Sequence, residues 1–180
     1  QSTAWFKTMA EGSGFQESDL RRLIEGSLYY NKVTEAIKAE APATAEQVHA
    51  AHILVKTKEE ADAALARLNS GEDFAQLAAE LSQDTSNKDN GGDLGWFPRG
   101  QMAAEFEDAA FALEAGQTSE PVETSFGFHI IRVLEKDAAR PLEGNALTNA
   151  QDAAVTAWFA AQRTSPEVVR SWDSSMAPTR

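Results

Sequence analysis

One glycine-rich segment, residues 90–102, constrains the fold of this chain more than any other feature. It runs Asn-Gly-Gly-Asp-Leu-Gly-Trp-Phe-Pro-Arg-Gly-Gln-Met, so four glycines are set among Leu94, Trp96, Phe97 and Met102. Glycine permits sharp backbone turns, which can direct several bulky apolar side chains to one place. The segment lies between two histidine stretches that could converge on it, His52-Ile-Leu-Val and Phe128-His129-Ile-Ile. The pattern predicts a small apolar pocket beside two histidines.

Charge and composition exclude several classes of function. The formal net charge is −12 over 180 residues, and Lys and Arg are scattered singly, which argues against nucleic acid or an anionic membrane as a partner. The chain has no cysteine, so a disulfide framework, a thiolate nucleophile and a cysteine-ligated zinc site are impossible. No apolar run reaches the roughly 18 residues that span a bilayer, and the start does not resemble a signal peptide. A signal or membrane anchor is therefore expected only outside this sequence.

Apolar periodicity predicts helices on both sides of a region that contains strands. A long helix is expected from about Asp19 to Ala39, ending before Pro42 because the residue preceding proline is excluded from the helical conformation. A shorter helix is expected around Trp5 to Met9. Strands are expected at 48–56 and 128–135, with helices at 58–70, 73–82 and 105–113. This order predicts an α+β domain with helices packed on an antiparallel sheet.

Four motifs in this region resemble those of a parvulin-type peptidyl-prolyl cis-trans isomerase. They are Val-His-Ala-Ala-His-Ile-Leu-Val at 48–55, Gly-Gly-Asp-Leu-Gly at 91–95, Phe-Glu-Asp-Ala-Ala-Phe-Ala-Leu at 106–113 and Gly-Phe-His-Ile-Ile at 127–131. The resemblance extends from about residue 47 to 136, roughly half of the chain. It implies catalysed rotation about X-Pro bonds, whose barrier of about 20 kcal/mol is set by amide resonance. Such catalysis favours a twisted amide and requires no cofactor, metal or covalent intermediate.

The resemblance also implies four catalytic positions, His52, Asp84, Thr124 and His129. The histidines are expected on adjacent strands, with the Thr124 hydroxyl bonded to one of them, and to fix tautomers and strand geometry rather than to move protons. Asp84 would repel the partial negative charge of the substrate carbonyl and so disfavour the planar amide. The alternatives are satisfied structural histidines and a turn-forming aspartate. His49 is expected on the opposite face of the strand from His52, which argues against a metal site formed by the two.

The proline pocket implied by the resemblance consists of Leu94, Met102 and Phe106, with Phe126 at its rim. The alternative is that these apolar residues belong to the core. The loop after Lys56 leads into Glu59 and Glu60 and lacks the basic cluster of phosphate-directed relatives, so phosphorylated substrates are not expected. The neighbouring acids Glu107 and Asp108 are interpreted as a solvated helix face, which gives no support for a hydrolase.

Large apolar residues also occur at both ends of the chain. Trp5, Trp158 and Trp172 lie outside the isomerase-like region, and burying the two ends against each other would remove them from water. We therefore expect a helical segment at 1–46, an isomerase domain at 47–137, and a final segment at 138–180. This last segment would consist of a linker near Arg140 and a helix from about Asn149 to Arg163. In this arrangement Trp158 and Phe159 pack on the long helix near residues 20–28. The split helical domain resembles bacterial extracytoplasmic foldases of the SurA and PrsA kind.

The sequence thus predicts a prolyl isomerase that assists the folding of extracytoplasmic proteins. Its partners would be unfolded or partly folded polypeptides that contain X-Pro bonds. The alternative is a parvulin-fold module that captures unfolded chains with little catalysis. Both a monomer and a dimer that exchanges its terminal helices are compatible with the pattern.

Overall fold

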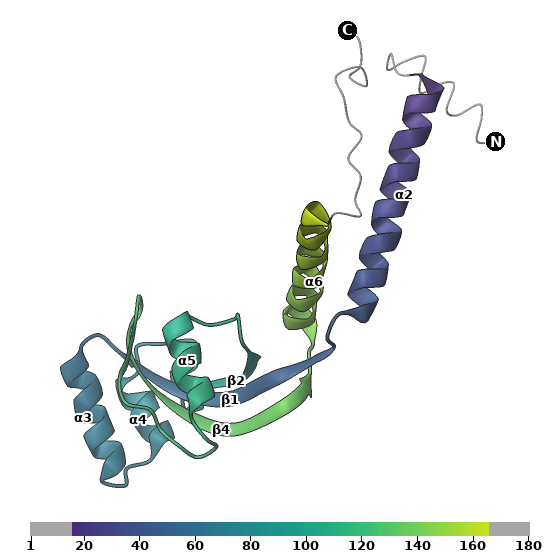
Figure 1. Cartoon of the computed structure of the whole chain (residues 1–180). Coiled ribbons are helices and arrows are strands. Elements are labelled where there is room, and N and C mark those ends of the chain that lie inside the picture. The colour runs from purple at the N-terminus through teal and green to yellow at the C-terminus, as the bar shows by residue number, and fades with distance from the viewer. Residues whose placement is uncertain (1–15, 166–180) are drawn as a thin grey trace. The chain divides into compact units, whose positions relative to one another are not determined.

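The computed structural model describes residues 16–165 (Figure 1). The helix expected around Trp5 and the apolar residues Val168, Val169 and Trp172 lie outside this range. The elements follow in the order α2 (Glu17–Glu40), β1 (Thr44–Val55), α3 (Lys58–Asn69), α4 (Phe74–Leu81), the 3-10 helix η1 (Lys88–Asn90), β2 (Asp93–Pro98), α5 (Ala104–Ala112), β3 (Val122–Thr124), β4 (Gly127–Pro141) and α6 (Gly144–Thr164).

The chain divides into two compact units. One is continuous, from Ala43 to Leu147, and the other joins the residues up to Pro42 with those from Thr148 onward. The continuous unit contains every described strand together with α3, α4 and α5. The second unit contains α2 and most of α6.

The four strands form one antiparallel sheet in the order β2-β1-β4-β3. The long central strands β1 and β4 pair along their whole length, from Thr44 opposite Pro141 to Val55 opposite Phe128. The predicted α+β class with an antiparallel sheet is confirmed. Because β1 and β4 are neighbours, residues more than 70 positions apart in sequence come together at the centre of the sheet.

Two apolar clusters pack on this sheet. One joins Ile53 and Ile130 of the central strands to the apolar faces of α3 and α4, including Leu77. The other joins Val48 and Ile131 to residues of α5 and to Phe97 of β2, with Phe106, Ala110 and Phe111 from the helix. Successive residues of a strand alternate between faces, so Val48 and His52 share the side on which α5 packs. Helix α5 therefore covers the sheet next to the histidine.

Local signals place the ends of these helices. The Thr57 hydroxyl accepts from the Glu60 backbone N–H and the Glu60 carboxylate accepts from Thr57, which starts α3 with a capping box. The Asp73 carboxylate starts α4 by accepting from the Gln76 N–H. Helix α2 ends before Pro42, as predicted, with Ala41 in an extended conformation.

The sheet extends beyond both expected limits of the isomerase domain, residues 47 and 137. Strand β1 begins at Thr44, and Arg140, expected in a linker, lies in β4 opposite Ala45. The side-chain amide of Gln47 holds this end by donating to the carbonyl oxygens of Arg140 and Pro141. Helix α6 likewise begins at Gly144 rather than near residue 149. Hydrophobic periodicity misses this part because the paired strands there bury few apolar side chains.

Helices α2 and α6 contact each other within the second unit. The rings of Tyr30 and Phe159 stack with their centroids 5.3 Å apart, and Lys38 forms an ion pair with Asp152. Trp158 lines a groove with residues of α2 that include Val33 and Ile37. These contacts begin at Tyr30 and not in the expected range of 20–28, where Leu23 and Leu28 are 71% and 55% exposed. None of the described helices is long and apolar enough to cross a bilayer.

Candidate active site

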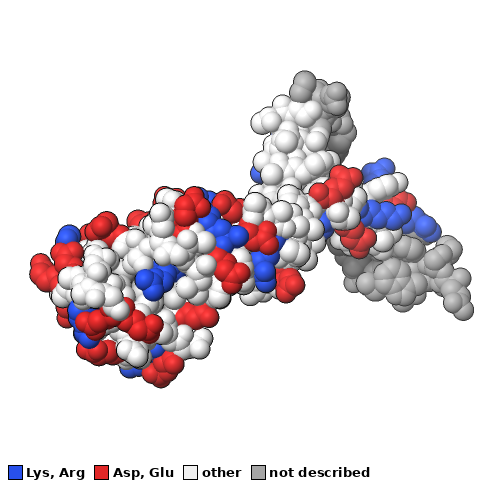
Figure 2. Space-filling view, turned by 90° about the horizontal axis from the view of Figure 1, so that it is seen from below, with Lys and Arg blue, Asp and Glu red and all other residues white. Residues whose placement is uncertain are grey.

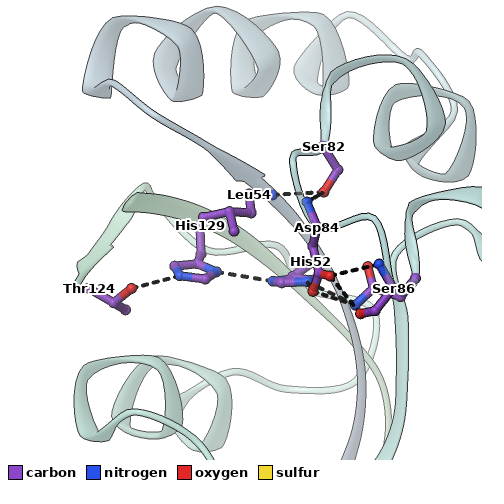
Figure 3. Close-up of polar contacts among 8 residues, drawn as sticks. His52, Leu54, Ser82, Asp84, Ser86, Thr124 and His129 are labelled. Atoms are coloured by element: carbon purple, nitrogen blue, oxygen red, sulfur yellow. Dashed lines mark hydrogen bonds and ion pairs between the residues drawn. The ribbon is translucent and has the colours of Figure 1, made fainter. Parts of the chain in front are cut away.

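His52 and His129 form the centre of a hydrogen-bonded network (Figure 3). His52 comes from β1 and His129 from β4, and their Nδ1 atoms are 3.0 Å apart. The two rings stack with an interplanar angle of 18°, and both residues are buried. The Thr124 hydroxyl lies 2.8 Å from His129 Nε2. The structure thus brings together the two histidines and the threonine that the sequence singled out.

Asp84 reaches this network from the turn that follows α4. Its Oδ2 lies 3.0 Å from His52 Nε2, and its Oδ1 accepts from the Ser86 backbone N–H and hydroxyl. The turn itself is held to the sheet, because the Ser82 hydroxyl accepts from the Leu54 N–H (Figure 3). Asp84 is therefore fixed in place next to the histidine pair.

Asn87 belongs to the same network and was not predicted from the sequence. Its side-chain Nδ2 donates to Asp84 Oδ2 at 2.8 Å and lies 3.1 Å from His52 Nε2. Asn87 is buried, and its Oδ1 has no hydrogen-bond partner among the described residues. The only local signal is its position three residues after Asp84 in a polar turn, a spacing at which side chains commonly meet.

Electrostatics fix the protonation states of the network. Burial lowers the pKa of His52, against the opposing effect of its hydrogen bond to Asp84. Burial, assisted by the nearby His52, lowers the pKa of His129 to about 4. Burial alone would raise the pKa of Asp84, but hydrogen bonds from Ser86 and His52 outweigh it and bring that pKa to about 2. At neutral pH the aspartate is therefore ionised and both histidines are neutral.

These states define one consistent direction of donation. Ionised Asp84 can only accept, so His52 donates from Nε2 and leaves Nδ1 as an acceptor. His129 then donates from Nδ1 to His52, and its own Nε2 accepts from the Thr124 hydroxyl. Each ring nitrogen has a partner within this chain of bonds. The arrangement holds both rings rigidly without an acid and a base poised for proton transfer.

An open cavity of about 400 Å³ lies against the histidines, the size of a small-ligand site. The ring of Phe106 packs edge to face against both imidazoles, with centroid distances of 5.8 Å to His52 and 5.3 Å to His129. Seven of the eight predicted site residues line the cavity: His52, Asp84, Leu94, Met102, Phe106, Phe126 and His129. The eighth, Thr124, does not line it but contacts His129. Phe126 is 74% exposed, as suits a rim.

The glycine-rich segment shapes one wall of this cavity. Gly92 has a φ of 77°, and its carbonyl accepts from the His52 N–H at 2.9 Å. A Cβ at position 92 would overlap the backbone oxygen of His52, so only glycine allows this approach. Only two of the four large apolar residues of the segment face the pocket. Leu94 and Met102 line it, whereas Phe97 is buried in the core and Trp96 lies against His49 and Arg140.

Two further side chains differ from or extend the sequence interpretation. Glu107, expected on a solvated face, is only 7% exposed, and its carboxylate accepts backbone N–H groups of the preceding loop. Helical spacing could have indicated its burial, because it precedes the buried Ala110 and Phe111 by three and four residues. His49 binds Asp93 at 2.8 Å, away from the cavity. Between residues 16 and 165, no group of three or more His, Asp or Glu side chains could hold a metal ion.

Sequence comparison places this site in a known family. The sequence profile of the PPIC-type PPIASE domain matches residues 32–137, more than half of the chain. The chain belongs to this family. The resemblance predicted from the four motifs is thereby confirmed, and the matched region contains the whole histidine network and the cavity.

One curated relative and one solved structure match more of the chain than the PPIC-type domain does. The chain is 40% identical over 142 residues to Foldase protein PrsA 4 of Bacillus cereus, covering 77% of this chain and 51% of that protein. It is 50% identical over 95 residues to Foldase protein PrsA of a Geobacillus strain, covering 53% of this chain and 34% of that protein. The crystal structure of the peptidylprolyl isomerase PrsA from Bacillus cereus superposes with a TM-score of 0.63 at 34% identity, covering 92% of this chain and 69% of that one. The chain thus spans about half or less of these two curated relatives.

Proposed function

We propose that this chain is a peptidyl-prolyl cis-trans isomerase that acts on unfolded or partly folded polypeptides. The observation that carries the proposal is the apolar cavity bounded by Leu94, Met102 and Phe106 directly beside the His52–His129 pair and ionised Asp84. Such a cavity suits a proline ring. The relatives named as foldases support the same activity.

The mechanism that this geometry supports is non-covalent. The apolar walls remove water from the X-Pro amide, which weakens its polar resonance form. The charge of Asp84 repels the carbonyl oxygen most strongly in the planar, polarised amide, and less in the twisted state. The neutral histidines hold the sheet and Asp84 in position, since each of their ring nitrogens is already engaged. No proton has to be transferred.

The surroundings of the cavity favour unphosphorylated substrates. Among the described residues, those that line the cavity include no lysine or arginine. At the nearby start of α3, Lys58 is engaged by Asp62 at 2.8 Å. Figure 2 shows Lys and Arg interspersed with Asp and Glu over much of the face it displays. A phosphate group would thus find no arginine cluster at the site.

Exchange NMR on an unphosphorylated X-Pro peptide tests the activity. Without catalysis, cis-trans exchange takes on the order of tens to hundreds of seconds. We expect the 180-residue chain at catalytic concentration to speed this exchange enough to broaden the cis and trans proline signals. A matched phosphoserine-proline peptide should exchange more slowly. Binding of the peptide without faster exchange would refute the enzyme and favour a module that only captures unfolded chains.

The helical unit is proposed to supply contacts with client polypeptides outside the cytoplasm, as the likeness to PrsA foldases suggests. The exposed Leu23, Leu28 and Tyr29 of α2 support this role. The fragment Ala43–Leu147, which holds the whole site, should keep the isomerase rate but lose the ability to suppress aggregation of a refolding protein. If it retained both, the helical unit would have no part in client binding. The same proposal includes a membrane anchor outside this sequence. The chain would act either as a monomer or as a dimer that exchanges its terminal helices.

A further inference from the structure

Glu107 is a buried acid that the catalytic network does not use. It lies in the first turns of α5, next to Phe106, and only 7% of its surface is exposed. Burying a carboxylate costs several kcal/mol unless strong partners replace the lost water. Among the ion pairs of residues 16–165, none joins Glu107 to a lysine, arginine or histidine. Its partners must therefore be found in the backbone.

Three consecutive backbone N–H groups supply them. The Gly100 N–H donates to Oε2 at 2.9 Å, and the Gln101 and Met102 N–H groups both donate to Oε1 at 2.8 Å. Hydrogen bonds to an ionised acceptor are roughly twice as strong as neutral ones, and here three converge on one side chain. The loop turns at Gly100, whose φ of 88° is a left-handed conformation. One side chain thus holds three consecutive residues of the connection between β2 and α5.

This connection carries a wall of the substrate cavity. Met102 is the last of the three residues held by Glu107, and its side chain lines the cavity. A methionine has three rotatable bonds and adapts to its surroundings, so its place in the cavity depends on how firmly its backbone is held. Phe106, directly before Glu107 on α5, lines the same cavity. Glu107 thereby links the backbone of Met102 to helix α5, which supplies Phe106 as the neighbouring wall.

We propose that Glu107 is a positioning residue for substrate binding, which sets the proline pocket by clamping the loop of residues 100–102. Its side chain does not line the cavity, and its hydrogen bonds go to the loop and not to the histidine network. Its contribution should therefore appear in the affinity for the substrate and not in the rate of rotation of the bound amide. The inference rests on the proposed isomerase function, because it concerns the same cavity.

Substitutions at Glu107 separate this role from a purely stabilising one. In Glu107→Gln, the remaining oxygen can still accept from Gln101 and Met102, but the amide nitrogen opposes the Gly100 N–H, so one bond is lost. In Glu107→Ala all three are lost. We expect the Kd for an X-Pro peptide to rise about threefold and about tenfold respectively, the size of effect that a lost contact in an apolar pocket produces. The rate of interconversion of the bound peptide should change less than about twofold.

Glu105→Gln is the matched control. Glu105 lies on the same first turn of α5, is exposed and carries the same charge, but makes none of these loop contacts. Its Kd should equal that of the unmodified chain. An equal rise in Kd for Glu105→Gln would show that loss of negative charge on α5, and not the clamp, controls affinity.

A double-mutant cycle with Met102→Ala decides whether the clamp acts through Met102. If it does, Glu107→Ala should weaken binding far less when Met102 is already Ala, and the methyl NMR signal of Met102 should shift in Glu107→Ala but not in Glu105→Gln. Fully additive effects on Kd, or a lowered Tm with an unchanged Kd, would overturn the proposal. If Glu107→Ala does not fold, an unchanged Kd in Glu107→Gln would overturn it as well. An unmodified chain that binds the peptide without catalysis would refute the isomerase function alone, since Kd and the methyl signal would still report the clamp.

Discussion

The histidine pair should make the stability of this domain depend on pH in a defined window. The pKa of His129 is lowered from its ordinary value of 6.5 to about 4, first by burial and then by the neighbouring His52. The folded state binds a proton on His129 less readily than the unfolded state does. The contribution of His129 to the free energy of unfolding is therefore fully present above pH 6.5 and decreases as the pH falls towards 4. His52, whose pKa is also lowered by burial, acts in the same direction.

The magnitude follows from the size of the shift. At about 1.4 kcal/mol per pKa unit, His129 accounts for at most about 3 kcal/mol by pH 4 and about 2 kcal/mol at pH 5. Its side chain lines an open cavity, so water screens part of this effect. Asp84 adds to the loss only at lower pH, because its pKa lies at about 2, below the ordinary 3.8. The loss of stability between pH 6.5 and about 5 therefore comes from the histidines and not from Asp84.

Urea unfolding at a series of pH values measures this loss directly. We expect the free energy of unfolding to fall steadily between pH 6.5 and 4.5 in the unmodified chain, and to fall less in His129→Gln, which removes one titrating ring and relieves its repulsion of the other. His49→Gln is the control, since that ring is bonded to Asp93 outside the cavity. If His129→Gln kept the full slope, or if the His129 ring titrated near pH 6.5 by NMR, the burial argument would be wrong.

Further variants test the cavity and its walls. Gly92→Ala should lower the free energy of unfolding by about 3 kcal/mol or more, because the added Cβ would meet the His52 carbonyl. Gly95→Ala, where no atom lies within 4 Å of the added Cβ, should cost only the roughly 1–2 kcal/mol of a left-handed backbone. Equal urea midpoints for the two variants would contradict this. Met102→Ala should weaken peptide binding about tenfold with little change in Tm. Phe106 is only 4% exposed, so Phe106→Ala should weaken binding and also lower the free energy of unfolding by about 3 kcal/mol. An unchanged free energy of unfolding in Phe106→Ala would place that ring outside the core. Asp84→Asn should slow bound-state rotation about tenfold, or about 1.4 kcal/mol in the barrier, at nearly unchanged Kd, and an unaltered rate in exchange NMR would remove Asp84 from the mechanism.

Much of the site could be predicted because its residues lie in short motifs with fixed local structure. His52 and His129 each lie within a strand pattern. The antiparallel pairing of those strands, with His52 opposite Ile131 and Leu54 opposite His129, makes them diagonal neighbours. Asn87 escaped prediction because its role depends on where the turn after α4 meets β1, which no local pattern encodes. The direction of the Trp96 side chain could not be predicted for a related reason. Gly95, with a φ of 68°, lies between Leu94 and Trp96 and breaks the simple alternation of the strand.

Two acids show why residue type alone does not assign function. Asp84 and Glu107 both accept several hydrogen bonds from nearby N–H or O–H donors, and in the sequence each is an acid beside polar or acidic neighbours. The difference is what lies on the far side of each carboxylate. Asp84 borders the cavity, so its charge can act on a substrate carbonyl, whereas Glu107 faces only the loop that builds the cavity. Removing the first charge should therefore change the rate of rotation, and removing the second should change affinity, although both substitutions delete one negative charge from the same domain.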